Sequence, residues 1–205
     1  MVLSDIQDTL IFHGSRCTDF GLPEPPANLP NDVHYLFNRE AEKAEGERLS
    51  LSLKDEQRVA FDTIIAATDE DNQRSRCFFL DGPGGSGKTH LYKTLLSVMI
   101  GRDEIVLPVA STGIAANLLK GGRTYHSQYK LPVPLLETSV SNMKLNSAEA
   151  ELIRRAKLLI WDESTMATSH ALNTVDRLLK EIMNNHLPFG GKVTLLGGDF
   201  DSVCL

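Results

Sequence analysis

The feature that most constrains this chain is a glycine-rich segment, GPGGSGKT, at Gly82–Thr89. It follows a short apolar run, Cys77–Leu80, whose length and composition predict a buried strand. It precedes Thr89–Ile100, in which leucine and valine recur at helical spacing. The pattern GxxxxGK[ST] between a strand and a helix is that of a phosphate-binding P-loop. The segment therefore predicts binding of a nucleoside triphosphate.

The residue types in this segment each have a physical role. Glycines allow the backbone to turn with positive φ and bring its N–H groups close to phosphate oxygens. The helix that begins near Lys88 directs its positive dipole end at the anion. The Lys88 ammonium reaches the β and γ phosphates, and the Thr89 hydroxyl ligates Mg²⁺. The predicted nucleotide-binding residues here are Gly82, Pro83, Gly84, Gly85, Ser86, Gly87, Lys88 and Thr89.

Two adjacent carboxylates follow a second predicted strand, Leu158–Trp161. We expect Asp162 to hold Mg²⁺ through water, and Glu163 to orient and deprotonate the attacking water. A solvated surface pair is the alternative, but four apolar residues before the pair and a P-loop upstream argue against it. Hydrolysing motors carry this glutamate, whereas small-molecule kinases usually lack it.

A third predicted strand, Val193–Leu196, ends in Gly197, Gly198 and Asp199. Strand ends on one edge of a parallel sheet converge on the ligand crevice, which would bring Asp199 near the γ-phosphate. A simple turn after a strand explains the same pattern equally well.

Strands and helices alternate along the chain, which predicts an α/β fold with a parallel sheet covered by helices on both faces. Ser52 and Asp55 are candidate caps of a helix that carries Val59, Phe61, Ile64 and Ile65. The remaining predicted elements are a strand at Ile105–Ala110 and helices at Ile114–Leu119, Ala148–Ala156 and His170–Met183, the last with Leu172, Val175, Leu179 and Ile182 inward.

The first 49 residues read as a separate helical and linker extension, followed by the main domain at 50–205. Residues 1–21 favour a short helix, 22–31 contain four prolines and indicate a linker, and 33–49 favour a charged surface helix with a solvated face.

Composition excludes several protein classes. No apolar run approaches the eighteen or so residues that a membrane span needs, and the N-terminus lacks the basic region of a secretory signal. The three cysteines, Cys17, Cys77 and Cys204, form no CxxC pair, so neither a disulfide framework nor a zinc site is indicated. A reducing intracellular compartment fits this usage. The net charge of −6 argues against a protein that coats nucleic acid but allows a local basic track.

Such a track occurs at residues 105–136, which contain no Asp or Glu although the average density predicts about four. Basic groups, aromatic rings and hydroxyls in one stretch suit the backbone and stacked bases of a single strand. A neutral loop that happens to lack acids is the alternative. The stretch holds Lys120, Arg123, His126 and Lys130, the interleaved Tyr125 and Tyr129, and the hydroxyls of Ser111, Thr112, Thr124 and Ser127.

Taken together, these motifs resemble the petite integration frequency (Pif-type) DNA helicases, particularly the helicase portion of Helitron transposons. The resemblance runs from about Leu3 to Phe200 and includes the upstream DFGLPEPP. The segments that show it most clearly are LSLKDEQRVAFD, FFLDGPGGSGKTHLY, VASTGIAANLLKGGRTYHSQYKLP, LLIWDESTM and LPFGGKVTLLGGDF.

The resemblance implies a RecA-like first motor lobe that uses ATP and Mg²⁺, with Gln57 reading the adenine base. It further implies 5′-to-3′ DNA unwinding in repair, recombination or transposition, in the nucleus. The single-strand motifs centre on Ser111–Ala115 and Thr124–Ser127. The predicted DNA-binding residues are Ser111, Thr112, Gly113, Arg123, Thr124, His126, Ser127 and Lys130.

Two departures from the family pattern bear on activity. Asp201 and Ser202 stand where the family has Arg and Gln, and the sequence stops before a second lobe that would supply an arginine finger. We therefore expect this chain to bind nucleotide, hydrolyse it slowly and not unwind DNA by itself. Two alternatives are a nucleotide and single-strand binding module with negligible catalysis and a P-loop kinase; Glu163 and the lack of an arginine-rich lid argue against the kinase.

Overall fold

The computed structural model describes residues 17–21, 23, 37–69 and 76–199. The chain divides into two compact units, Met1–Asn31 and Asp32–Leu205. In the first unit, the described residues form the short 3₁₀ helix η1 (Cys17–Phe20). The rest of the helix predicted at 1–21, nearly all of the linker at 22–31 and the start of the helix predicted at 33–49 lie outside the described residues.

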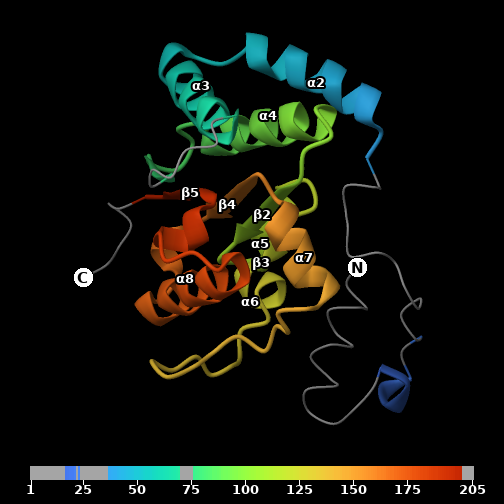
Figure 1. Ribbon diagram of the computed structural model, residues 1–205. Coiled ribbons are helices and arrows are strands. Elements are labelled where there is room, and N and C mark those ends of the chain that lie inside the picture. Colours follow the sequence, from blue (N-terminus) through green and yellow to red (C-terminus); the bar gives the residue numbers. More distant parts are fainter. Residues whose placement is uncertain (1–16, 22, 24–36, 70–75, 200–205) are drawn as a thin grey trace. The chain divides into compact units, whose positions relative to one another are not determined.

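The second unit is built on a five-stranded, fully parallel sheet with the order β1-β5-β4-β2-β3 (Figure 1). The predicted parallel α/β architecture is confirmed. Two-residue β3 was not predicted because so short a strand has no periodicity to read. The strands are β1 (Cys77–Asp81), β2 (Val106–Ala110), β3 (Arg123–Thr124), β4 (Leu158–Asp162) and β5 (Val193–Gly198).

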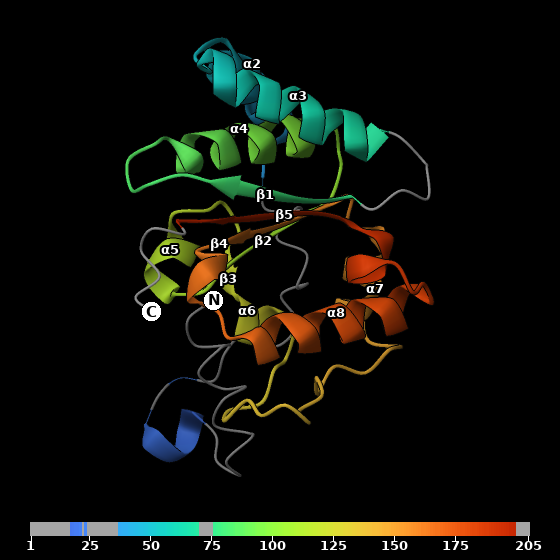
Figure 2. The same ribbon diagram turned by 90° about the vertical axis from the view of Figure 1, so that its left-hand side faces the viewer.

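Helices cover both faces of this sheet, as Figures 1 and 2 show from two directions. On one face lie α2 (Arg39–Leu51), α3 (Asp55–Asp69) and α4 (Lys88–Gly101). On the other lie α6 (Tyr125–Gln128), α7 (Ala148–Arg155) and α8 (Ser169–Met183). The shorter elements are α5 (Gly113–Asn117), η3 (Ser164–Met166) and η4 (Pro188–Gly191).

Each face has its own hydrophobic core. Phe61 and Ile64 of α3 and Leu95 of α4 pack with the sheet on one side. Trp161 of β4 and Leu179 of α8 belong to the core on the other side. All five residues of β2 and of β4 are buried, as expected of central strands covered on both faces.

Helix α3 buries three of the four apolar residues named for it. Phe61, Ile64 and Ile65 are buried, but Val59 is 67% exposed. Residues 61, 64, 65 and 68 share one helical face, and Val59 lies two positions from Phe61, which turns it about 200° away. Ser52 does not cap α3: it is the C-cap of α2, where its hydroxyl donates to Leu49 O at 2.8 Å.

Helix α2 belongs to the second unit rather than to a separate extension that ends at residue 49, because it packs along α4. Its predicted solvated face is wrong at Glu42, which is buried. The Glu42 carboxylate accepts from Lys120 Nζ at 2.7 Å, and the same ammonium donates to Ser97 Oγ at 2.9 Å. A cation of the predicted basic track is therefore used to hold α2 in place.

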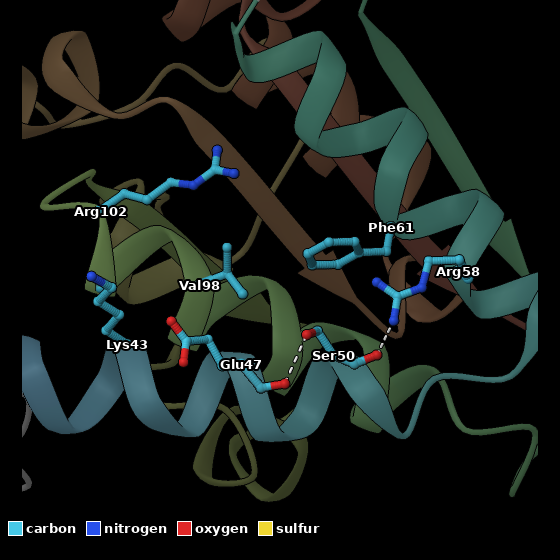
Figure 3. A pocket seen from close by; sticks show the side chains of 8 residues that line it. Lys43, Glu47, Ser50, Arg58, Phe61, Val98 and Arg102 are labelled. Atoms are coloured by element: carbon cyan, nitrogen blue, oxygen red, sulfur yellow. Dashed lines mark hydrogen bonds between the residues drawn. The ribbon is translucent and has the colours of Figure 1, made fainter.

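A pocket of about 330 Å³ lies between α2, α3 and α4 (Figure 3). The Arg58 guanidinium donates to the Ser50 carbonyl there and lies 5.7 Å from the centre of the Phe61 ring. This pocket is on the side of α4 that faces away from the sheet, so it is separate from the strand ends.

No helix among the described residues is long and apolar enough to cross a membrane.

The Glu42–Lys120 pair should contribute strongly to stability. Lys120→Ala leaves a buried carboxylate without its cation, so we expect it to lower the free energy of unfolding by about 2–3 kcal/mol in urea denaturation. The exposed Glu45–Arg48 pair has the same 2.7 Å separation and is the matched control. Arg48→Ala should cost much less, because water screens an exposed ion pair. Equal losses in the two variants would contradict a special role for the buried pair.

Candidate functional site

The candidate site forms at the edge of the sheet where the strands end. The register pairs Asp81 with Gly198, and Ala110 with both Asp162 and Thr124. The strands are parallel, so the segments that follow them leave the sheet at one common edge. The P-loop, the acid pair, Asp199 and both predicted single-strand motifs therefore start from this edge.

The P-loop is already folded into a turn that opens α4. Gly85 and Gly87 have φ values of 82° and 94°, which favour glycine. The Ser86 amide donates to Pro83 O at 3.2 Å, and the Gly82 amide donates to Gly198 O at 3.2 Å. The loop is thus tied to the end of β5, and Thr89 lies in the first turn of α4.

Lys88 folds back over the loop that precedes it. Its ammonium donates to the carbonyl of Gly82 and, at 3.2 Å, to that of Pro83. These two carbonyls are the hydrogen-bond acceptors of the Lys88 ammonium. A phosphate bound in the turn would offer Lys88 a stronger, charged acceptor.

Gln57 lies against the P-loop from the start of α3. Its Nε2 donates to Gly87 O at 3.3 Å, and its Oε1 accepts from the Lys54 amide at 3.0 Å. A Cβ on Gly87 would lie 2.3 Å from that Nε2, so the approach requires glycine there. Nearby, Ser52 Oγ and His90 Nε2 are 3.0 Å apart. The segment predicted to read the base is therefore beside the phosphate turn.

Asp162 is a buried carboxylate at the end of β4. Its Oδ1 accepts from the Glu163 amide at 2.9 Å. Burial raises the pKa of Asp162, and the Glu163 charge adds to this, whereas the Glu163 amide, the Lys88 charge and the Tyr92 hydroxyl lower it. A buried, destabilised anion is well suited to a divalent cation.

The other candidate metal ligand, Thr89, comes from α4. Among the described residues no group of three or more His, Cys, Asp and Glu side chains is arranged to hold a metal ion. A Mg²⁺ ion at Thr89 and Asp162 would therefore depend on phosphate oxygens for further ligands, as in nucleotide sites. The donor set fits a metal that arrives with its nucleotide.

Glu163 has an uncommon backbone conformation, with φ 54° and ψ 35°. A left-handed non-glycine residue costs roughly 1–2 kcal/mol. The turn is fixed by two bonds: the Met166 amide donates to Glu163 O at 3.0 Å, and Ser164 Oγ donates to Gly197 O at 3.0 Å. The structure thus directs the chain sharply away after β4, at the predicted catalytic residue.

Asp199 follows β5, the strand between β1 and β4. This order places it between the P-loop strand and the acid-pair strand, which favours the γ-phosphate hypothesis over a simple turn. Asp201 and Ser202 lie outside the described residues.

Several hydroxyls of the predicted DNA track have internal partners. Ser111 Oγ accepts from Trp161 Nε1 at 3.2 Å, and the Ser111 amide donates to Asp162 O at 3.1 Å. Thr112 caps α5 by accepting from the Ala115 amide, and Thr124 caps α6 by accepting from the Ser127 amide. These residues shape the two motifs, and the link from Ser111 to Asp162 was not foreseen from the sequence.

The prediction that aromatic rings of this track suit stacked bases is wrong for its two tyrosines. Tyr125 and Tyr129 are buried, and their ring centres lie 4.8 and 6.2 Å from that of Trp161. They are core residues and do not offer faces to bases. The His126 ring is 4.1 Å from Tyr125, and burial lowers the His126 pKa, so the imidazole is neutral near pH 7. Gly113, Arg123, Ser127 and Lys130 are the other predicted members of the track.

A model of the PIF1-like helicase family matches residues 52–204, most of the chain. The chain belongs to the PIF1-like helicase family. It is 34% identical over 124 residues to ATP-dependent DNA helicase Pif1 of Psychrobacter sp., covering 60% of this chain and 19% of that protein. It is 29% identical over 192 residues to PIF1 of Candida albicans, covering 87% of this chain and 20% of that protein.

Solved Pif1 structures agree with this membership. Pif1 from Bacteroides in complex with ADP-AlF3 and ssDNA matches at 30% identity with a TM-score of 0.59. That match covers 72% of this chain and 32% of the Bacteroides chain. The 205 residues thus span about one fifth of the length of the curated PIF1-like relatives and about a third of the solved chain.

Asp162→Asn should stabilise the nucleotide-free lobe. The raised pKa of Asp162 means that its charge is disfavoured in the folded state. We expect the melting temperature at pH 7 to rise, because the neutral amide does not carry the penalty of a buried charge. The gain should vanish as the pH falls below the ordinary carboxyl range, where Asp162 is protonated in both states.

The exposed Asp62→Asn on α3 is the control for this measurement and should leave the melting temperature unchanged. A lower melting temperature for Asp162→Asn at neutral pH would contradict the assignment of Asp162 as a destabilised buried charge.

Proposed function

We propose that this chain is the ATP-binding and ATP-hydrolysing first lobe of a DNA helicase. The observation that supports it is the shared sheet edge, where the P-loop follows β1 and the Asp162–Glu163 pair follows β4, with β5 between them. Phosphoryl transfer needs positioned charges around the phosphates, and these strand ends bring such groups together.

The chain's own residues have distinct roles in this proposal. The amides of the P-loop and the Lys88 ammonium bind the phosphates, and Gln57 orients the base. Thr89 and Asp162 would hold Mg²⁺, which when bound supplies positive charge to the β and γ phosphates. Glu163 accepts a proton from the attacking water, and Asp199 lies toward the γ-phosphate side.

Single-stranded DNA is the proposed second ligand. The Bacteroides Pif1 relative was solved with ssDNA, and the two single-strand motifs of this chain start from the same edge as the nucleotide site. The bond from the Ser111 amide to Asp162 O joins the first DNA motif to the metal-holding strand. Through this bond, a shift of the motif at Ser111 would also move the end of β4. The proposed contacts are Ser111, Thr112, Gly113, Arg123, Thr124, His126, Ser127 and Lys130.

Finer assignments remain our proposals. They are membership of the Helitron branch, 5′-to-3′ unwinding of DNA in repair, recombination or transposition, and work in the nucleus. The motif resemblance of the sequence supports them. The alternative, a binding module with little catalysis, is separated from an ATPase by phosphate release with and without single-stranded DNA.

Two substitutions test the nucleotide site. Lys88→Ala should abolish ATP binding, measured with a fluorescent nucleotide, because the phosphates lose their cation. Glu163→Gln should bind ATP as the wild type does but lower phosphate release at least a hundredfold, because the general base is gone. The exposed Lys93→Ala, on the same helix as Lys88, is the control for both. Equal loss of binding in the Lys88 and Glu163 variants would contradict these separate roles.

Salt dependence tests the DNA track. Arg123→Ala and Lys130→Ala should each weaken binding to single-stranded DNA and reduce the slope of log K against log salt by about 0.7. Lys157→Ala removes an exposed lysine just before β4, at the opposite edge of the sheet, and should leave the slope unchanged. Identical slopes in all three variants and the wild type would remove Arg123 and Lys130 from the DNA interface.

A further inference from the structure

Tyr92 is a buried tyrosine on α4, three residues after Thr89. The side chain is 0% exposed, and its hydroxyl oxygen meets no partner at full hydrogen-bond distance and angle among the described residues, although it is close enough to Asp162 to lower the pKa of that carboxyl. Buried polar groups nearly always have partners, because an unpaired one carries its full desolvation penalty. A phenylalanine would fill the same space without that penalty, so the hydroxyl calls for an explanation.

The hydroxyl points to the end of β5. A Cβ on Gly197 would lie 1.6 Å from Tyr92 Oη and 3.7 Å from Asp162 Oδ1. The phenol and the carboxylate are thus neighbours on the same side of Gly197, and any larger residue there would displace the phenol. Helix α4, strand β5 and strand β4 converge at this point.

The two groups are chemically complementary. A phenol keeps its proton at neutral pH and is a hydrogen-bond donor. Asp162 accepts one hydrogen bond through Oδ1, from the Glu163 amide, and an ionised carboxylate has further acceptor sites.

We propose that Tyr92 is a positioning residue that donates its hydroxyl proton in a hydrogen bond to the Asp162 carboxylate and so orients it for Mg²⁺. This inference rests on the proposed nucleotide site. The bond would tie the helix that carries Lys88 and Thr89 to the strand that carries the acid pair. Partners of this kind, which orient a metal-binding carboxylate, typically change metal affinity by 10- to 100-fold.

Tyr92→Phe tests this role because it removes one oxygen and keeps the ring. The affinity for a fluorescent ATP analogue is measured during a Mg²⁺ titration and in EDTA. We expect the Mg²⁺ concentration for half-maximal binding to rise about tenfold, with affinity in EDTA unchanged. The melting temperature without ligand is measured in parallel and should stay close to that of the wild type, which shows that Tyr92→Phe folds.

Tyr129→Phe is the matched control, since Tyr129 is equally buried but belongs to the core on the other face of the sheet. It should leave the Mg²⁺ titration unchanged. In an Asp162→Ala background, Tyr92→Phe should have no further effect, because its hydrogen-bond acceptor is already absent.

An unchanged Mg²⁺ titration for folded Tyr92→Phe would overturn the positioning role, as would an equal effect of Tyr92→Phe with and without Asp162. A different outcome would concern the proposed function itself: absence of Mg²⁺-dependent nucleotide binding in the wild type would remove the nucleotide site and this inference together.

Discussion

The backbone hydrogen bonds of the parallel sheet are the interaction on which the rest of this structure depends. They align β1, β5, β4, β2 and β3 so that all five strands end at one edge. Two further bonds, from the Gly82 amide to Gly198 O and from the Ser111 amide to Asp162 O, continue the ladder past the strands. If one strand slipped by one residue against its neighbour, its side chains would move to the opposite face of the sheet, and the P-loop would no longer be aligned with the acid pair.

Several unfavourable features lie at that edge. Asp162 is a buried charge, Glu163 has a left-handed backbone, and the hydroxyls of Tyr92 and Thr165 are buried without partners among the described residues. The opposite edge has buried ionisable groups as well: Glu104 Oε2 is buried without a partner among the described residues, and burial raises the pKa of Glu104. There Lys192 donates to Ala156 O at 2.8 Å and to the Arg154 carbonyl, although burial lowers its pKa to about 8. Local conflicts of this kind are expected where a fold serves a function.

The N-terminal helix α2 illustrates how charge can serve packing. Lys120, from the stretch that lacks acids, reaches Glu42 on α2 and Ser97 on α4. Its charge therefore stabilises the arrangement of two helices and is partly removed from the surface. The same stretch sends Tyr125 and Tyr129 into the core beside Trp161. The DNA track that remains is narrower than its composition indicates.

The sequence by itself determined the P-loop, the acid pair and most helices and strands, because each depends on spacing within a few residues of the chain. The parallel α/β class followed from the alternation of those elements. Only the tertiary structure decided the strand order, the burial of Tyr125, Tyr129 and Glu42, and the meeting of Tyr92 with Asp162. Such contacts join residues far apart in the chain, and local periodicity carries no information about which distant partner a side chain meets.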